Sequence, residues 1–449
     1  MNQASSITPG SKAFEVNNRL VLAIAIPMTV AYVTTPLLGL VDTTVVGQFG
    51  DPALLGGLAA GAIIFDVVFA SFNFLRSGTT GLVAQAFGRG ESLEERAVFL
   101  RACAIAIACG LALVLLVPPV ATMGEWFMGA EPGVTAAMDS YLRIRMISAP
   151  ASLLNYAILG YFLGRGEANL GLLLQLVLNS VNIVLSIWFG LRLGWGVAGV
   201  AWGTVCGEIV TALLGLAIIG RRFIAMPKVV WPQVFATTAL RRMLALNGDI
   251  MIRSFVLMGA FTLLTRQGAQ LGTLTLAANA VLMHFFMVSS YFLDGFATAA
   301  EQLAGRAVGA RYLPAFNRAI RLTSLWGFGM AGVASVIALL FGDQLIGIIT
   351  TAASVREEAA LYLPWAALTA ISGVMAFQMD GVFIGATWSR DMRNMMLLSF
   401  AVFVAALLLL GHFFGNHGLW AALHIFLIAR GLSLMAILPR SVRATFSEG

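Results

Sequence analysis

The chain has 449 residues, of which 59% are hydrophobic and only 11% are charged. Soluble globular proteins carry about 25% charged residues, so this composition excludes a soluble globule. The net charge is +6, but the basic residues are scattered among connections and form no patch, which argues against a nucleic-acid partner.

Apolar runs of about 20 residues recur along the chain, separated by charged or Gly/Pro-containing breaks. Runs of this length are typical of transmembrane helices, whereas barrel strands need only about 10 residues. They predict an all-α polytopic membrane protein with about twelve spans. The expected span centres are Val30, Phe65, Ala108, Ala151, Leu178, Val205, Val256, Phe286, Ala331, Ala370, Val402 and Ile428.

Arginines gather in alternate connections, which the positive-inside rule assigns to the cytoplasm. The opposite connections are acidic or neutral. Because the number of spans is even, both termini are expected in the cytoplasm, with the chain in a bacterial inner membrane. The basic connections carry Arg89, Arg96, Arg101, Arg165, Arg221, Arg222, Arg241, Arg242, Arg306, Arg311, Arg390 and Arg393.

The sequence also indicates two repeated lobes, 1–219 and 243–449, joined by a cytoplasmic linker at 220–242 that contains two prolines. At an offset of 221 residues Gly88 matches Gly309, and GYFLG at 160–164 recurs as GVFIG at 381–385. Six spans in each lobe imply parallel repeats related by a pseudo-two-fold axis. Such repeats are typical of transporters with a site near mid-membrane.

The first span carries one acid, Asp42, at the end of an apolar run. A carboxylate at the bilayer centre costs about 2.5–3.5 kcal/mol or more, so it marks a functional site when it faces the protein interior. The alternative is that Asp42 lies near enough to the helix end to reach water.

Four polar residues of the fifth span repeat at helical spacing and therefore share one face. Isolated amides in a membrane often only tie helices together. Four on one face, with an almost wholly apolar counterpart at 396–410, favour a hydrated cavity. The four are Gln175, Asn179, Asn182 and Ser186.

The second lobe has its own polar candidates for a substrate cavity. One face of the eighth span carries Tyr291, Asp294, Thr298 and Glu301, and the tenth span contains Asp380. Met283 and Met287 offer adaptable apolar surface, although methionine is also a common gap-filler of cores.

Other ionisable residues lie within spans. Asp249 and Arg253 are spaced i, i+4 and are expected to pair. Asp66, Glu208 and Arg430 have no partner near them in sequence, and each is either a proton-binding group or a tie between helices.

Motifs for other chemistry are missing. There is no P-loop and no HExxH, and neither the histidines nor the three cysteines have a metal-ligand spacing. We therefore expect no cofactor, no metal site and no enzymatic activity.

These features together resemble the multidrug and toxic compound extrusion (MATE) family, and most closely its DinF-type branch. The resemblance covers nearly the whole chain. It is carried by separated stretches that include IPMTVAYVTTPLLGLVDTTVVGQ, SGTTGLVAQAFGRGE, ISAPASLLNYAILGYFLG, LNSVNIVLS, LALNGDIMIRS, MDGVFIGAT and ARGLSL. It implies two six-helix lobes that form a V around a central cavity.

The resemblance also implies roles for particular residues. Asp42 matches the first-helix aspartate that couples ions in the family, and Asn182 and Thr204 match its polar neighbours. A first-helix proline that permits bending matches Pro27, and Pro36 is a second candidate. The family pattern NxxxD reads NIVLS here, so Ser186 stands where a second carboxylate is usual. A hydroxyl does not balance a cation as a carboxylate does.

The resemblance implies efflux of amphipathic, often cationic, organic compounds in exchange for inward H⁺ or Na⁺. Because Ser186 leaves one carboxylate in the first-lobe site, we expect H⁺ with Asp42 as the protonation site, and Na⁺ is the alternative. A lipid-linked precursor flippase is a further alternative, which would need a strongly cationic cavity. The expected partners are small drug-like molecules, the coupling ion and the lipid bilayer, and the expected state is a monomer.

Overall fold

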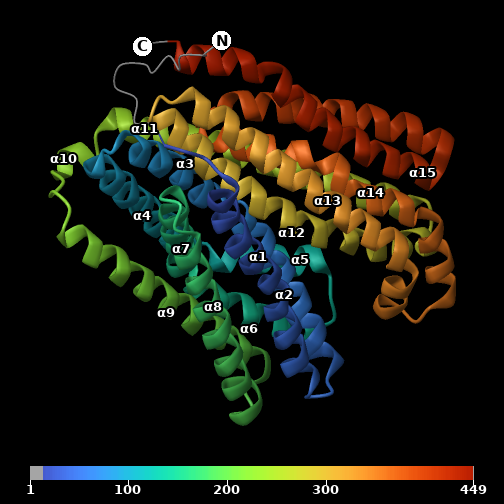
Figure 1. The fold of residues 1–449 in the computed structure, drawn as a ribbon. Coiled ribbons are helices and arrows are strands. Elements are labelled where there is room, and N and C mark those ends of the chain that lie inside the picture. The colour runs from blue at the N-terminus through green and yellow to red at the C-terminus, as the bar shows by residue number, and fades with distance from the viewer. Residues whose placement is uncertain (1–13, 448–449) are drawn as a thin grey trace. The chain divides into compact units, whose positions relative to one another are not determined.

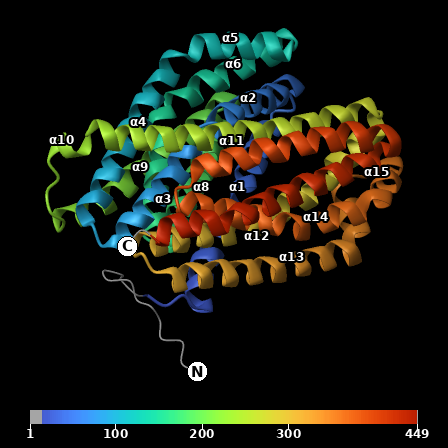
Figure 2. The same ribbon diagram turned by 90° about the horizontal axis from the view of Figure 1, so that it is seen from above.

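The computed structural model describes residues 14–447, and nearly all of them are helical (Figures 1 and 2). The longer helices are α1 (Asn18–Gly47), α2 (Pro52–Ala70), α3 (Phe74–Arg89), α4 (Ser92–Leu115), α5 (Val117–Met128), α6 (Pro132–Ile147), α7 (Ala149–Gly164), α8 (Ala168–Leu185), α9 (Gly196–Ile224), α11 (Thr237–Gln270), α12 (Thr273–Gly309), α13 (Leu313–Ile349), α14 (Ala353–Gly385) and α15 (Ser389–Phe446). The short elements are the π-helix η1 (Ser186–Arg192) and α10 (Trp231–Val234).

Ten helices of the described residues are long and apolar enough to cross a membrane, or eleven when the bent pair α6 and α7 counts as one span. The expected all-α membrane protein is therefore confirmed. The count falls below twelve partly because α15, at 58 residues, covers both of the last two expected spans. Its backbone breaks at Gly415, where φ is 54°.

Contacts divide the described residues into two compact units. One unit comprises 14–29, Gly88–Gly90 and 248–447, and the other comprises Val30–Phe87 and Glu91–Asn247. We call them the C unit and the N unit. The boundary between Thr29 and Val30 lies inside the continuous helix α1, two residues after Pro27. The predicted lobe limits, of which residues 1–13 lie outside the described part, stay a prediction.

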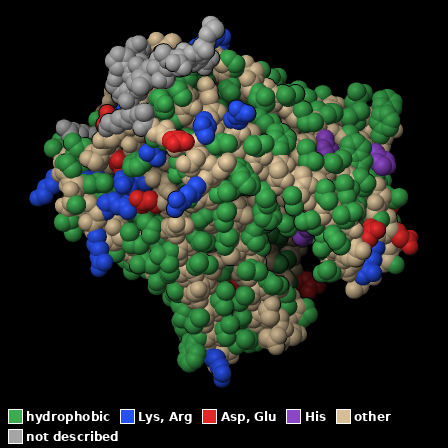
Figure 3. Space-filling model, in the orientation of Figure 1, with side chains coloured by type: hydrophobic (Ala, Val, Ile, Leu, Met, Phe, Trp, Pro, Cys, Tyr) green, Lys and Arg blue, Asp and Glu red, His purple; other side chains and the backbone are tan. Residues whose placement is uncertain are grey.

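Within each unit a few helix pairs make most of the contacts. In the C unit α14 lies beside α12, α13 and α15, an arrangement visible in both ribbon views (Figures 1 and 2). In the N unit the main pairs are α2 with α6, α8 with α9, and α4 with α7. Hydrophobic side chains cover much of the visible face, as a lipid-facing surface requires (Figure 3).

The repeated glycine motif has the same structural role in both units. A Cβ at Gly160 would lie 2.6 Å from the carbonyl oxygen of Arg76, and Gly381 approaches the carbonyl of Ala297 in the same way. Arg76 and Ala297 are themselves 221 residues apart. The motif therefore marks one helix contact that occurs twice, once between α7 and α3 and once between α14 and α12.

Candidate ion-coupling and substrate site

Asp42 lies in α1 and is buried in the N unit, with 8% of its surface exposed. Ser186 is within reach of its carboxylate for a side-chain hydrogen bond, and Arg145 acts on it electrostatically. The carboxylate oxygen Oδ1 has no hydrogen-bond partner among the described residues. Asp42 is thus an interior acid rather than one that reaches water at the helix end.

A network of short polar contacts joins α8 to α9 next to Asp42. Asn182 Nδ2 donates to Thr204 Oγ1 at 2.6 Å, and Ser186 Oγ donates to Asn182 Oδ1 at 3.4 Å. Both hydroxyl groups also lie within hydrogen-bond distance of the Val200 carbonyl oxygen. All three side chains are buried. The network ties the predicted fifth-span face to the sixth span.

Local sequence explains why η1 and α9 approach so closely. A Cβ at Gly203 would lie 2.6 Å from the Ser186 nitrogen, and one at Gly199 would lie 2.5 Å from the Gly190 nitrogen. The backbone also widens into the π-helix η1, which begins at Ser186. π-helical segments occur frequently at functional sites, and this one starts at Ser186, next to the polar network.

The other two residues of the predicted polar face of α8 form a separate hydrogen-bonded pair. Gln175 Nε2 donates to Asn179 Oδ1 at 2.8 Å, and Asn179 Nδ2 donates to the Thr34 carbonyl oxygen at 3.5 Å. Thr34 is in α1, two residues before Pro36. Asn179 therefore connects the polar face of α8 to the proline-containing part of α1.

The sequence reasoning missed a buried arginine, Arg145 of α6, in this unit. Its Nη1 lies 3.0 Å from Glu208 Oε1, and its guanidinium carbon lies 3.9 Å from the centre of the Phe65 ring. Ser152 donates a hydrogen bond to the other Glu208 oxygen. Arg143 and Arg145 follow an outer connection whose other charges are acidic, and arginines in that position are the signal that could have identified Arg145.

In the C unit, Asp380 of α14 is buried between two arginines. It forms ion pairs with Arg253 of α11 and, at 2.5 Å, with Arg430 of α15. The expected pairing of Asp249 with Arg253 is wrong, because both residues find partners on other helices. Asp249 pairs with Arg393 at 2.5 Å instead.

The eighth-span candidates lie along α12 at different depths. Glu301 and Thr298 are buried, whereas Tyr291 and Asp294 are half-buried. The Thr298 hydroxyl donates to the backbone carbonyl oxygen of Asp294 at 2.8 Å. These four residues lie along one helix. No pocket found in the described part of the chain is lined by them together with Asp380.

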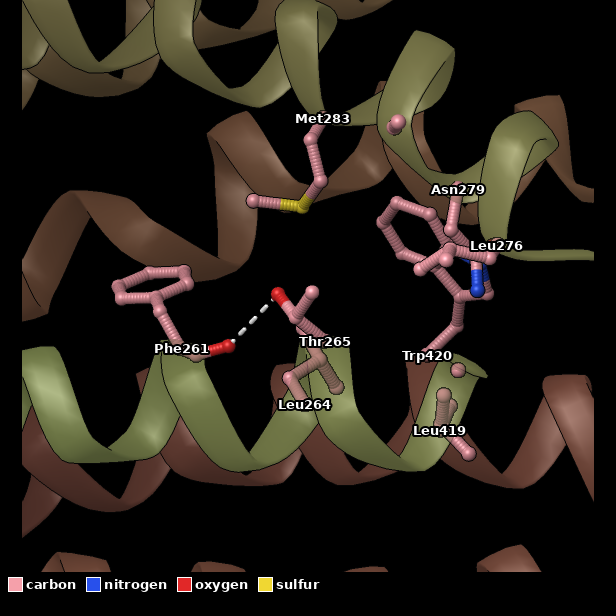
Figure 4. A pocket seen from close by; sticks show the side chains of 10 residues that line it. Phe261, Leu264, Thr265, Leu276, Asn279, Met283, Leu419 and Trp420 are labelled. Carbon is pink, nitrogen blue, oxygen red and sulfur yellow. Dashed lines mark hydrogen bonds between the residues drawn. The ribbon is translucent and has the colours of Figure 1, made fainter. Parts of the chain in front are cut away.

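Met283 lines a pocket of about 240 Å³ in the C unit, whereas Met287 is 47% exposed and lies outside it. Figure 4 shows Met283 facing Phe261 and Leu264 across this pocket. At one end, Asn279 exchanges hydrogen bonds of 2.7 and 3.0 Å with Asn416. No acid lines the pocket.

The many apolar helices, the repeated helix contact and the buried polar network define a polytopic membrane protein with the architecture of a transporter. The chain belongs to the MatE family, because the family model matches residues 27–188 and 250–410. The two matched segments correspond to the two repeats, and members of the family are transporters rather than enzymes.

Relatives cover nearly the full length of the chain. DNA damage-inducible protein F of Escherichia coli (strain K12) is 39% identical over 430 residues, which is 94% of this chain and 92% of that protein. Probable multidrug resistance protein NorM of Chromobacterium violaceum is 25% identical over 459 residues, covering 95% of this chain and 94% of that protein. The resemblance to the DinF-type branch is confirmed.

Solved structures show the same fold at low sequence identity. An outward-facing multidrug resistance MATE family transporter of the MOP superfamily superposes with a TM-score of 0.87 at 18% identity, covering 96% of this chain and 97% of that one. A MOP superfamily transporter from Pyrococcus furiosus superposes with a TM-score of 0.86 at 17% identity and the same coverage.

Proposed function

We propose that this chain is a secondary antiporter that exports amphipathic, often cationic, organic compounds in exchange for inward H⁺. Asp42 is the protonation site, and Asn179, Asn182, Ser186 and Thr204 are its polar surroundings. The observation that carries the proposal is the burial of Asp42 beside this network, with one carboxylate oxygen left without a hydrogen-bond partner.

The chemistry of the surroundings favours H⁺ over Na⁺. Hard cations are bound by several oxygen ligands, commonly with more than one carboxylate. Ser186 supplies a hydroxyl where a second carboxylate would stand, and its hydroxyl is directed to Asn182. A single buried acid with an unpartnered oxygen is suited to taking up a proton, which also removes a charge that is costly to bury.

Protonation is coupled to movement through α1. Loss of charge on Asp42 changes its interactions with Ser186 and Arg145. Pro27 and Pro36 already remove backbone hydrogen bonds in α1, so bending is least costly there. The proton shifts the conformational equilibrium only by binding one state more tightly than the other.

Substrate candidates in the C unit are Tyr291, Asp294, Glu301, Met283 and Met287, together with Asp380. A flippase for lipid-linked precursors is less well supported, because the half-buried Arg253 and the buried Arg430 both pair with Asp380. We also propose a monomer. The arginine distribution supports our proposal that both termini lie in the cytoplasm.

The test is transport by purified protein in proteoliposomes. A pH gradient and a Na⁺ gradient are imposed in separate experiments while efflux of a cationic dye is followed. The proposal expects efflux with the pH gradient alone. Efflux driven by Na⁺ but not by H⁺ would show that the coupling ion is Na⁺, and no efflux with either gradient would contradict an antiporter for such compounds.

A further inference from the structure

The segment that joins α9 to α11, residues 220–242, contains five basic residues and no acidic residue. It includes the short helix α10 and is held against the first turns of α4 by two arginines. Arg96 Nη1 donates to two backbone carbonyl oxygens of the segment at 3.1 and 3.2 Å, and Arg101 Nε donates to the Val234 carbonyl oxygen at 2.5 Å. The segment is therefore a fixed part of the N unit rather than a loose connection.

The contact with Arg101 sets the depth of α10 relative to the spans. α4 has no charged side chain between Arg101 and its end at Leu115, so Arg101 marks the level at which this helix enters the hydrocarbon. The segment also connects two helices that are themselves long and apolar enough to cross a membrane, α9 and α11. α10 therefore lies at the level where lipid headgroups meet acyl chains.

α10 turns an aromatic face away from the protein. Val234 is buried, whereas Trp231 and Phe235 are 64% and 45% exposed. The two aromatic residues are four positions apart and so share one side of the helical turn. Their rings stack with centroids 6.0 Å apart and planes within 8° of each other. Aromatic residues at this level are typical of membrane-interface anchors, since the ring contacts both acyl chains and headgroups.

The basic residues of the same segment carry charge that the protein does not neutralise. Acids at this end of the N unit are already engaged, in the pairs Arg101–Glu94, Arg165–Glu95 and Arg222–Glu167. The exposed basic residues of the segment have no ion-pair partner among residues 14–447, and they are Arg221, Lys228, Arg241 and Arg242. In Figure 3 Lys and Arg side chains gather over α10 and the adjoining helix ends.

We propose that α10 and these four basic residues form a docking surface for anionic phospholipids. Trp231 and Phe235 lie against the upper acyl chains, and the basic groups bind the lipid phosphates. The proposed cytoplasmic side of the segment assigns the surface to the inner leaflet, whose anionic lipids attract basic groups next to a span. A soluble polyanion would match the charges but would leave the aromatic pair in water. The proposal is independent of the transported compound and of the coupling ion.

The experiment measures lipid binding to the purified full chain in detergent by native mass spectrometry. The probes are dioleoylphosphatidylglycerol and dioleoylphosphatidylcholine, which share their acyl chains and differ in headgroup charge. For wild type we expect binding of the phosphatidylglycerol to be at least about tenfold tighter, with a preference that weakens as salt is raised because the charges are exposed. Equal affinities for the two lipids would overturn the proposal, as would displacement of the phosphatidylglycerol by inorganic phosphate.

A charge variant and a matched control locate the binding. The charge variant combines Lys228→Gln, Arg241→Gln and Arg242→Gln. The control removes three exposed charges of the C unit by combining Arg318→Gln, Arg321→Gln and Arg440→Gln. We expect the charge variant to lose at least about tenfold in phosphatidylglycerol affinity and to keep its phosphatidylcholine affinity, while the control binds like wild type. Equal losses in both variants would show that binding follows total charge, and the proposal would be wrong.

Trp231→Ala tests the aromatic part of the surface. We expect weaker binding of both lipids with an unchanged preference between them, because the ring contacts acyl chains that the two lipids share. Trp126→Ala on α5 is the control, since Trp126 is 82% exposed and lies outside the segment. Binding of both lipids by Trp231→Ala at wild-type affinity would contradict the anchoring role of α10.

Discussion

The side-chain amide of Asn182 donates a 2.6 Å hydrogen bond to the hydroxyl oxygen of Thr204, across the interface of α8 and α9. This bond fixes the amide so that Asn182 Oδ1 faces Ser186, which donates to it. The hydroxyl of Ser186, a residue that also acts on the Asp42 carboxylate, is thereby directed to Asn182. The interface of two helices thus sets the hydrogen bonding next to the proposed protonation site.

Thr204→Val should destabilise the protein and reduce transport. Valine keeps the shape of threonine, but it leaves the buried Asn182 Nδ2 without its acceptor, at a cost of about 1–3 kcal/mol. Apparent melting temperature in detergent and dye efflux in proteoliposomes check this. Thr262→Val is the control, since Thr262 is exposed and its hydroxyl bonds only within its own helix. Equal melting temperatures for Thr204→Val and wild type would contradict the role of this bond.

Gly203→Ala should separate η1 from α9. The new methyl group would lie 2.6 Å from the Ser186 nitrogen, which is backbone and cannot rotate away. Overpacking of this kind costs about 1–3 kcal/mol, and we expect lower stability together with lost efflux. Gly220→Ala in the same helix meets nothing within 4 Å and should be neutral or slightly stabilising. The prediction fails if the two variants behave alike.

Ser186→Asp should change the coupling ion. It restores a second carboxylate one turn after Asn182, which gives a hard cation the additional charged oxygen it requires. We expect efflux driven by a Na⁺ gradient alone in this variant and not in wild type. Asparagine has the size of aspartate but no charge, so Ser186→Asn should not gain Na⁺-driven efflux. If neither variant responds to Na⁺, then Ser186 does not determine ion choice.

Asp380→Asn tests whether the acid of the C unit has a structural role. Breaking a buried ion pair by removing one partner costs about 3–5 kcal/mol, because Arg253 and Arg430 would keep their charges without a counter-ion. We expect a large drop in apparent melting temperature. Asp249→Asn disrupts a more exposed pair with Arg393 and should cost less. Wild-type stability with altered substrate selectivity would instead support the predicted place of Asp380 in the substrate cavity.

The all-helical fold could be predicted from the sequence because lipid-spanning helices need apolar runs of a fixed length. The repeat was also visible, since GYFLG and GVFIG preserve glycines that a close helix contact requires in both units. The number of spans was harder to predict. Whether α15 is one helix or two depends on the backbone break at Gly415, and glycine alone does not indicate a break.

Part of the site was equally predictable. The four polar residues of the fifth span share a face by helical periodicity, and the structure places them in two hydrogen-bonded groups: Asn182 and Ser186 with Thr204, and Gln175 with Asn179. The ion pairs of Asp380 and Glu208 were not predictable, because their partners lie far apart in sequence. Arg145 and Glu208 are 63 residues apart, and Arg253 reaches Asp380 rather than its i, i+4 neighbour.

The central claim is that Asp42 carries the exchanged proton. Proteoliposomes with a pH-sensitive dye in the lumen report proton movement when a cationic substrate is added without an imposed gradient. For wild type we predict proton movement opposite to substrate movement, and for Asp42→Asn substrate binding without any proton movement. Substrate-dependent proton exchange at the wild-type rate in Asp42→Asn would contradict the account.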